Sequence, residues 1–194
     1  MKWLLACILF ISFAAGGQDC KTLNNFKSFH GVKIGKPFPD SLKKYFEIGS
    51  LQQTDTTFDL YDISIENKPS YSRLSKFLLF GDYFESISYF ISNKNVYCAM
   101  LVKSVNDEDS AYLAVNKNPI FYQNVSAELV SLFGKSTKKE RKDITFGEAI
   151  IQLWECDKMK IEFGINIYGG GSHYYLTITD INLEKIQKLK KLSE

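Results

Sequence analysis

Histidines, prolines and net charge are scarce in this chain. The shortage of histidines and the small net charge each argue against a class of function. Among 194 residues there are two histidines and four prolines. A catalytic zinc site usually needs two or three imidazoles with a carboxylate, and His30 and His173 form no short-spaced pair. The 24 lysines and arginines are nearly balanced by 22 acidic residues. This balance argues against a nucleic-acid-binding protein, which usually carries a basic excess.

Motifs for phosphate and calcium are also missing. The glycines at residues 169–171 lack the lysine and the helix that follow a phosphate-binding loop. Asp107, Glu108 and Asp109 form an acidic cluster, but the glycine and the terminal glutamate of an EF-hand are absent. We therefore expect a solvated loop at this cluster, and we expect neither a metal site nor a cofactor.

Two formal combinations of nucleophile and base are weak. Ser172, His173 and Asp180 could be listed as a triad, but neighbouring residues on a strand face opposite sides of a sheet. Cys156 with His173 would need a base within hydrogen-bond range and an oxyanion hole, and we interpret the cysteine as structural. We assign no catalytic residue. A hydrolase whose site gathers dispersed carboxylates and tyrosines is the alternative interpretation.

The long apolar run of the chain lies at its amino terminus. Lys2 precedes apolar residues 3–13, and small residues follow at 14–17, which is the pattern of a removable signal peptide. The run is shorter than the roughly 20 residues needed to cross a hydrocarbon core. We expect residues 1–17 to be removed on export to a periplasm or the cell exterior. Residues 18–194 are then expected to form one domain without a transmembrane segment.

Three cysteines would remain after this cleavage: Cys20, Cys98 and Cys156. Exported proteins commonly use cysteines in disulfides. Cys98 and Cys156 lie in strand-like runs and share a phase with apolar Met100 and Trp154, so both side chains can point inward. We predict a Cys98–Cys156 disulfide, with a bond that uses Cys20, or no bond, as alternatives. The residues before Cys20 fit a lipid-attachment motif poorly, so a lipid anchor is not expected.

Alternating apolar residues and turn residues predict an α+β protein dominated by antiparallel sheet. The strands are expected at residues 32–34, 58–65, 74–80, 83–91, 96–103, 149–155, 159–167 and 174–179. The helices are expected at residues 40–46, 118–133 and 183–192. Short turns between consecutive strands favour antiparallel meanders, packed by two or three helices.

Each half of the sequence therefore consists of a helix followed by a meander. Residues 34–38 lead into the first helix, and residues 132–135 end the second. In this layout the chain resembles the β-lactamase-inhibitor-like proteins, which are small exported bacterial proteins built from helix-plus-sheet modules. The resemblance implies one module or two in tandem, and a function in binding other proteins or in envelope assembly.

The run at residues 83–91 offers a candidate interaction surface. Both of its phases are partly apolar, and Phe84 and Phe90 share one of them, so they could meet either a partner or the protein's own helices. The chain has fifteen Phe and eleven Tyr, and Tyr is enriched where proteins meet. We expect a non-catalytic module that binds another exported or envelope protein. The sequence leaves the oligomeric state open.

Overall fold

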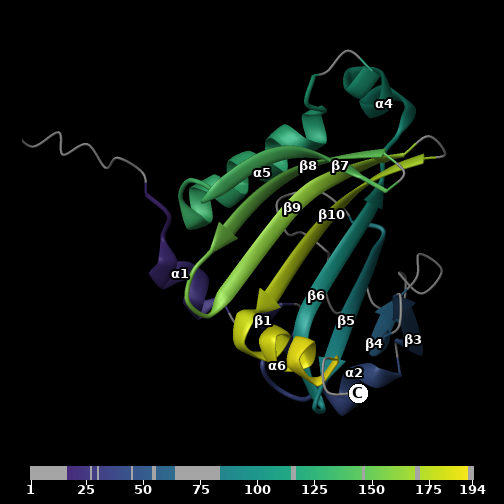
Figure 1. The fold of residues 1–194 in the computed structure, drawn as a ribbon, viewed down its shortest axis with the longest axis vertical. Coiled ribbons are helices and arrows are strands. Elements are labelled where there is room, and N and C mark those ends of the chain that lie inside the picture. The colour runs from purple at the N-terminus through teal and green to yellow at the C-terminus, as the bar shows by residue number, and fades with distance from the viewer. Residues whose placement is uncertain are drawn as a thin grey trace, which may run out of the picture.

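One antiparallel sheet dominates the computed structural model (Figure 1). The structure describes residues 17–26, 28–29, 31–44, 46–53, 56–63, 84–114, 117–145, 147–168 and 171–191. The strands in sheet order are β3 (Glu47–Gln53), β4 (Thr56–Ile63), β5 (Ser86–Ser92), β6 (Asn95–Ser104), β10 (Gly171–Asp180), β9 (Met159–Tyr168), β8 (Gly147–Glu155) and β7 (Lys138–Ile144). Residues 1–16, which make up almost all of the expected signal peptide, lie outside the described residues. The strand expected at residues 74–80 also lies outside them.

The sheet consists of two meanders joined at its centre. Strands β3 to β6 follow one another along the chain, as do β7 to β10, and the last strand of each set pairs with the other. The β6–β10 register places Val102 opposite Tyr175 and Met100 opposite Thr177. The predicted α+β class and the antiparallel meanders are confirmed, and both meanders belong to one continuous sheet.

Local sequence signals account for the best-predicted strands. Asn93 and Lys94 both have positive φ, as a type I′ hairpin turn requires, and they join β5 to β6. In β9 the apolar side chains alternate with polar ones, and Ile161, Phe163 and Ile165 are buried. The alternation buries one phase of the strand against the core and directs the other to the opposite face.

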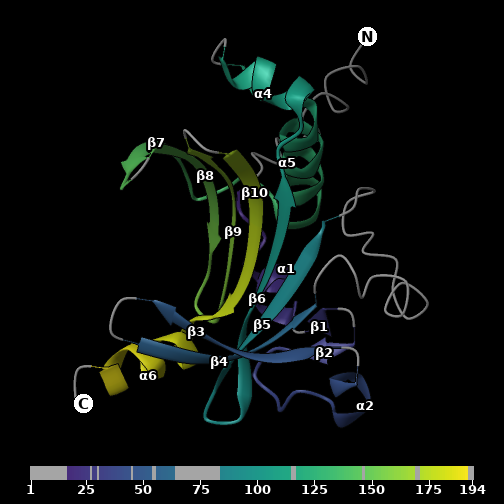
Figure 2. The ribbon, with the colours of Figure 1, turned by 90° about the vertical axis from the view of Figure 1, so that its right-hand side faces the viewer.

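Helix α5 (Ile120–Phe133) covers the first face of the sheet (Figure 2). Its buried side chains are Phe121, Tyr122, Val125, Leu129 and Phe133. They pack into the main core with apolar residues of the central strands. The helix was expected from residue 118 but begins at Ile120, after Pro119, and Gly134, whose φ is 73°, follows its last residue.

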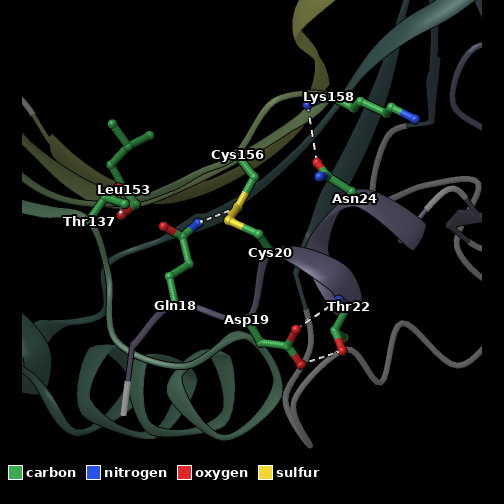
Figure 3. Close-up of a disulfide and its surroundings, with 9 residues drawn as sticks. All are labelled: Gln18, Asp19, Cys20, Thr22, Asn24, Thr137, Leu153, Cys156 and Lys158. Carbon is green, nitrogen blue, oxygen red and sulfur yellow. Dashed lines mark hydrogen bonds between the residues drawn. A yellow bond between two sulfur atoms is a disulfide. The ribbon is translucent and has the colours of Figure 1, made fainter. Parts of the chain in front are cut away.

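A disulfide holds the short helix α1 (Cys20–Asn25) against the core (Figure 3). Cys20 bonds to Cys156, which follows β8, with a Cα–Cα separation of 5.6 Å. Leu23 is completely buried, and the Phe26 ring packs against Phe133 of α5. Lys158 N donates a hydrogen bond to Asn24 Oδ1 at 3.1 Å. The amino-terminal segment is therefore part of the packed domain.

Several other elements differ from the sequence expectation. The first helix, expected at residues 40–46, is only α2 (Asp40–Lys43), and β3 begins soon after it at Glu47. The acidic cluster lies in helix α4 (Asp107–Ala114) and not in a loop. A two-stranded ribbon of β1 (Ser28–Phe29) and β2 (Val32–Lys33) precedes α2. The charged strand β7 was also unexpected.

The last helix, α6 (Ile181–Lys191), follows β10 directly. Asp180 Oδ1 accepts hydrogen bonds from Asn182 N at 3.0 Å and Leu183 N at 3.1 Å, which satisfies amide groups of the first turn. The helix crosses one end of the second face of the sheet (Figure 2). There Leu183 packs against Tyr97 and Cys98. Among the described residues, no helix has the length and apolar character to cross a membrane.

Candidate functional site

The second face of the sheet carries a concave groove of about 580 Å³. Strands β7 to β10 curve away from α5, so the groove opens on the side opposite that helix (Figure 2). Its apolar lining residues are Met100, Val102, Ile144, Ala149 and Ile151. Its polar and aromatic lining residues are Lys142, Thr145, Glu162, Asn166, Tyr168, His173, Tyr175 and Thr177.

The groove side chains form rows that run across the strands. One row contains Lys142, Ala149, Asn166 and His173, which lie opposite one another on β7, β8, β9 and β10. A second row, two residues further along the strands, contains Ile151, Gly164 and Tyr175. A third contains Glu162, Thr177 and Met100. The rows arise because paired residues in an antiparallel sheet point to the same face.

Gly164 creates the space in which Tyr175 lies. A Cβ atom at Gly164 would come within 2.7 Å of the Tyr175 ring carbon Cζ and hydroxyl oxygen, and within 2.7 Å of the Ile150 carbonyl. The Tyr175 ring therefore lies across β9, and its hydroxyl donates to Glu162 Oε1 at 2.8 Å. Burial and the adjacent Glu162 carboxylate raise the pKa of the Tyr175 phenol, so it stays a donor.

His173 is the imidazole of the groove. Its Nε2 lies 3.2 Å from Asn166 Nδ2, and its ring is 5.5 Å from that of Tyr168 at an interplanar angle of 32°. Burial lowers the pKa of His173, so the ring is neutral at pH 7 and accepts the amide proton of Asn166. Glu162 is four residues from Asn166 along β9, which is about 13 Å. The imidazole and the carboxylate therefore cannot act directly on one another.

Helix α6 packs on the same face of the sheet, beyond the groove row that contains Glu162, Thr177 and Met100. Lys160 Nζ forms an ion pair with Glu184 Oε2 at 3.2 Å, which joins β9 to the helix. Ser92 Oγ of β5 donates to Gln187 Oε1 at 2.6 Å. These contacts hold α6 over one end of the second face, and the groove lies beside it on β6 to β10.

The predicted interaction surface of Phe84 and Phe90 is not confirmed. Phe84 precedes β5, is 1% exposed and packs against Phe121 of α5. Phe90 is half-buried on the other face, where its ring meets Tyr97 and it packs in the cluster under Leu183 of α6. Phe84 therefore contacts α5, and Phe90 belongs to the same apolar cluster as Leu183 of α6.

The predicted Cys98–Cys156 disulfide is wrong, because Cys156 bonds to Cys20 and Cys98 is a buried free thiol. Phase along a strand showed that both side chains could point inward, but it carried no information on which elements lie together. Cys98 is on β6 beneath α6, whereas Cys156 follows β8 beside α1. The alternative pairing through Cys20 is the one observed.

Cys98 is expected to be unreactive in the native protein. Burial raises the pKa of its thiol to about 11, and Thr179 Oγ1 donates to its sulfur at 3.4 Å. At pH 8 the thiolate fraction falls by more than about 100-fold relative to an ordinary cysteine. We expect no colour with Ellman's reagent in buffer and rapid reaction of Cys98 in guanidinium. Stoichiometric labelling of the folded protein at the unfolded rate would contradict this.

The other residues considered for chemistry lie apart. His173 and Cys156 are at opposite ends of the sheet, and Cys156 is held in its disulfide. Asp180 caps α6 and lies at the far end of β10 from His173. Asp109 is buried and accepts a hydrogen bond from the Tyr174 hydroxyl at 2.7 Å. In the described parts of the chain, no three His, Cys, Asp or Glu side chains gather as a metal site.

Sequence reasoning missed the groove, although a signal for it was present. In the sequence, Lys160, Glu162 and Asn166 alternate with the apolar residues of β9, but such a polar phase normally indicates a solvated face. The groove forms because the fold places apolar residues of other strands, such as Ile151 and Met100, next to the polar side chains of β9. Comparisons of the chain with protein-family models, curated proteins and solved structures found no match.

Proposed function

We propose that the chain is an exported, non-catalytic module that binds another macromolecule through the concave groove. The observation that carries this proposal is the composition of the groove. Seven of the thirteen lining residues are apolar side chains or tyrosines, and Lys142 and Glu162 are the charged residues of the lining. Interface centres generally combine aromatic residues and Met with few charges.

The charged and titratable groups of the groove favour binding over hydrolysis. Glu162 accepts the Tyr175 hydroxyl, and the neutral His173 lies with Asn166 and Tyr168, about 13 Å further along the strands. A hydrolase of the alternative type needs an acid and a base within reach of one bond. Within the described residues, Glu162 is the one carboxylate that lines the groove.

The disulfide supports export without a lipid anchor. Structural disulfides form and persist mainly in oxidising compartments. Cys20 lies three residues beyond the expected cleavage region, and its sulfur is bonded to Cys156. A lipid on Cys20 would occupy the same sulfur atom, so the two modifications exclude each other. A macromolecular partner in the envelope or outside the cell fits this location.

The groove proposal can be tested by affinity capture from an envelope fraction of the native host. The bait would be wild type, the groove variant Met100→Arg, or the control Val130→Arg on the outer face of α5, where Val130 is 41% exposed. We expect one partner to be retained by wild type and Val130→Arg, and lost with Met100→Arg. Equal capture by all three baits would contradict binding through the groove. Circular dichroism would first establish that both variants fold.

A further inference from the structure

Strand β7 forms one edge of the sheet. It pairs with β8, and none of the segments that the structure describes pairs with its other side. Its seven residues carry four basic and two acidic side chains, and most of them are exposed. An unpaired edge can accept a further strand, and charges usually discourage this. Whether the charges of β7 discourage pairing with β7 of a second copy depends on their order along the strand.

Two-fold symmetry restricts how two copies of β7 can pair. Paired residues point to the same face, so an antiparallel pair must be centred on one residue that lies opposite itself. Centring on Glu140 places Lys138 opposite Lys142 and Lys139 opposite Arg141, with Glu140 opposite itself. Every pair in this register combines like charges, which repel across a strand pair.

Centring on Arg141 gives the opposite result. Lys139 then lies opposite Asp143 and Glu140 opposite Lys142, and symmetry forms each pair twice. Centring on Lys142 pairs Arg141 with Asp143, but it places Glu140 opposite the apolar Ile144, so this acidic residue has no basic partner, and Lys142 lies opposite itself. The register centred on Arg141 therefore matches the acidic residues of β7 with basic partners while leaving a single like-charged pair.

The like-charged pair on the axis is already compensated within each chain. Arg141 Nε donates to Glu148 Oε2 at 2.6 Å, and Nη2 also contacts this oxygen. Glu148 lies on the neighbouring strand β8. Each Arg141 therefore brings its own counter-charge to the axis.

We propose that the protein forms a two-fold symmetric dimer by antiparallel pairing of β7 with β7, centred on Arg141. This goes beyond the proposed function and uses a different surface from the groove. Glu140 and Lys142 lie on the groove face of the strand, so both grooves open on the same side of a continuous sheet. One seven-residue strand pair is a small interface, so we expect a dissociation constant on the order of 10 μM or above.

A charge swap tests the register. Sedimentation equilibrium of the purified protein should show that Glu140→Lys and Lys142→Glu each weaken the dimer by about tenfold or more, because each creates like-charged pairs. The double variant rebuilds both pairs and should return to within about threefold of wild type. Glu128→Lys, on the exposed face of α5, changes the net charge as Glu140→Lys does and should leave the dimer unchanged.

Disulfide trapping provides a second test that does not depend on affinity. In the proposed register the Cα atoms of Arg141 lie about 5 Å apart, within disulfide range, while those of Lys139 lie about 14 Å apart. Arg141→Cys should therefore cross-link two copies on mild oxidation, and Lys139→Cys should not. A monomer at all concentrations, no recovery in the double swap, or equal cross-linking of both cysteines would overturn the proposal.

Discussion

The Cys20→Ser/Cys156→Ser variant is expected to unfold with a free energy lower than that of wild type by about 5 kcal/mol. The two cysteines are 136 residues apart, so their bond closes most of the described chain into one loop. In the chain-entropy model, a loop of this length removes much of the conformational freedom of the unfolded state. Urea denaturation followed by far-UV circular dichroism would measure the difference.

Single variants provide the control for this prediction. Cys20→Ser and Cys156→Ser each break the same bond, so each should lose nearly as much stability as the double variant. Wild type in a reducing agent should behave similarly. Cys98→Ala leaves the bond intact and should lose far less. A double variant as stable as wild type would show that the bond does not stabilise the domain.

Replacing Trp154 with alanine is expected to lower the free energy of unfolding by about 3–5 kcal/mol. Trp154 is completely buried, and its indole Nε1 donates to the Gly134 carbonyl at 2.8 Å. The side chain thereby joins β8 to the end of α5. The substitution removes this hydrogen bond and leaves a large cavity in the core. Circular dichroism is the suitable measurement, since Trp3 is the other tryptophan and lies in the expected signal peptide.

A pair of further variants separates packing from hydrogen bonding. Trp154→Phe keeps most of the buried ring but leaves the Gly134 carbonyl without its donor, so a smaller loss of about 1–2 kcal/mol is expected. Leu132→Ala, on a residue that is 48% exposed on α5, should change stability by less than about 0.5 kcal/mol. If Trp154→Ala cost no more than Leu132→Ala, the proposed link between β8 and α5 would be wrong.

Much of the fold could be predicted because its signals are local. The alternation in β9 repeats every two residues, so the sequence alone identified a strand and its buried phase. The turn at Asn93 and Lys94 and the glycine after Phe133 likewise act on the residues beside them. The α+β class and the antiparallel meanders follow from such signals.

Elements that depend on distant neighbours were missed. Strand β7 has a charged sequence with no apolar phase, and it is a strand because β8 supplies its hydrogen-bond partners along a full edge. The disulfide depended on the end of β8 lying beside α1, which phase along a strand cannot reveal. Phe84 and Phe90 could be recognised as apolar, but which helix would meet each of them could not.

The amino-acid order by itself determined that this chain forms antiparallel strands with one strongly apolar phase, packed by a long helix. It also carried the charge order of β7, which selects one register for pairing with a second copy. Only the tertiary structure decided which face α5 covers and how much of the other face α6 leaves open. The groove consists of side chains from five strands, and strand curvature and the room left by Gly164 bring them together. These are properties of the packed sheet, because each strand contributes only alternate side chains to the groove.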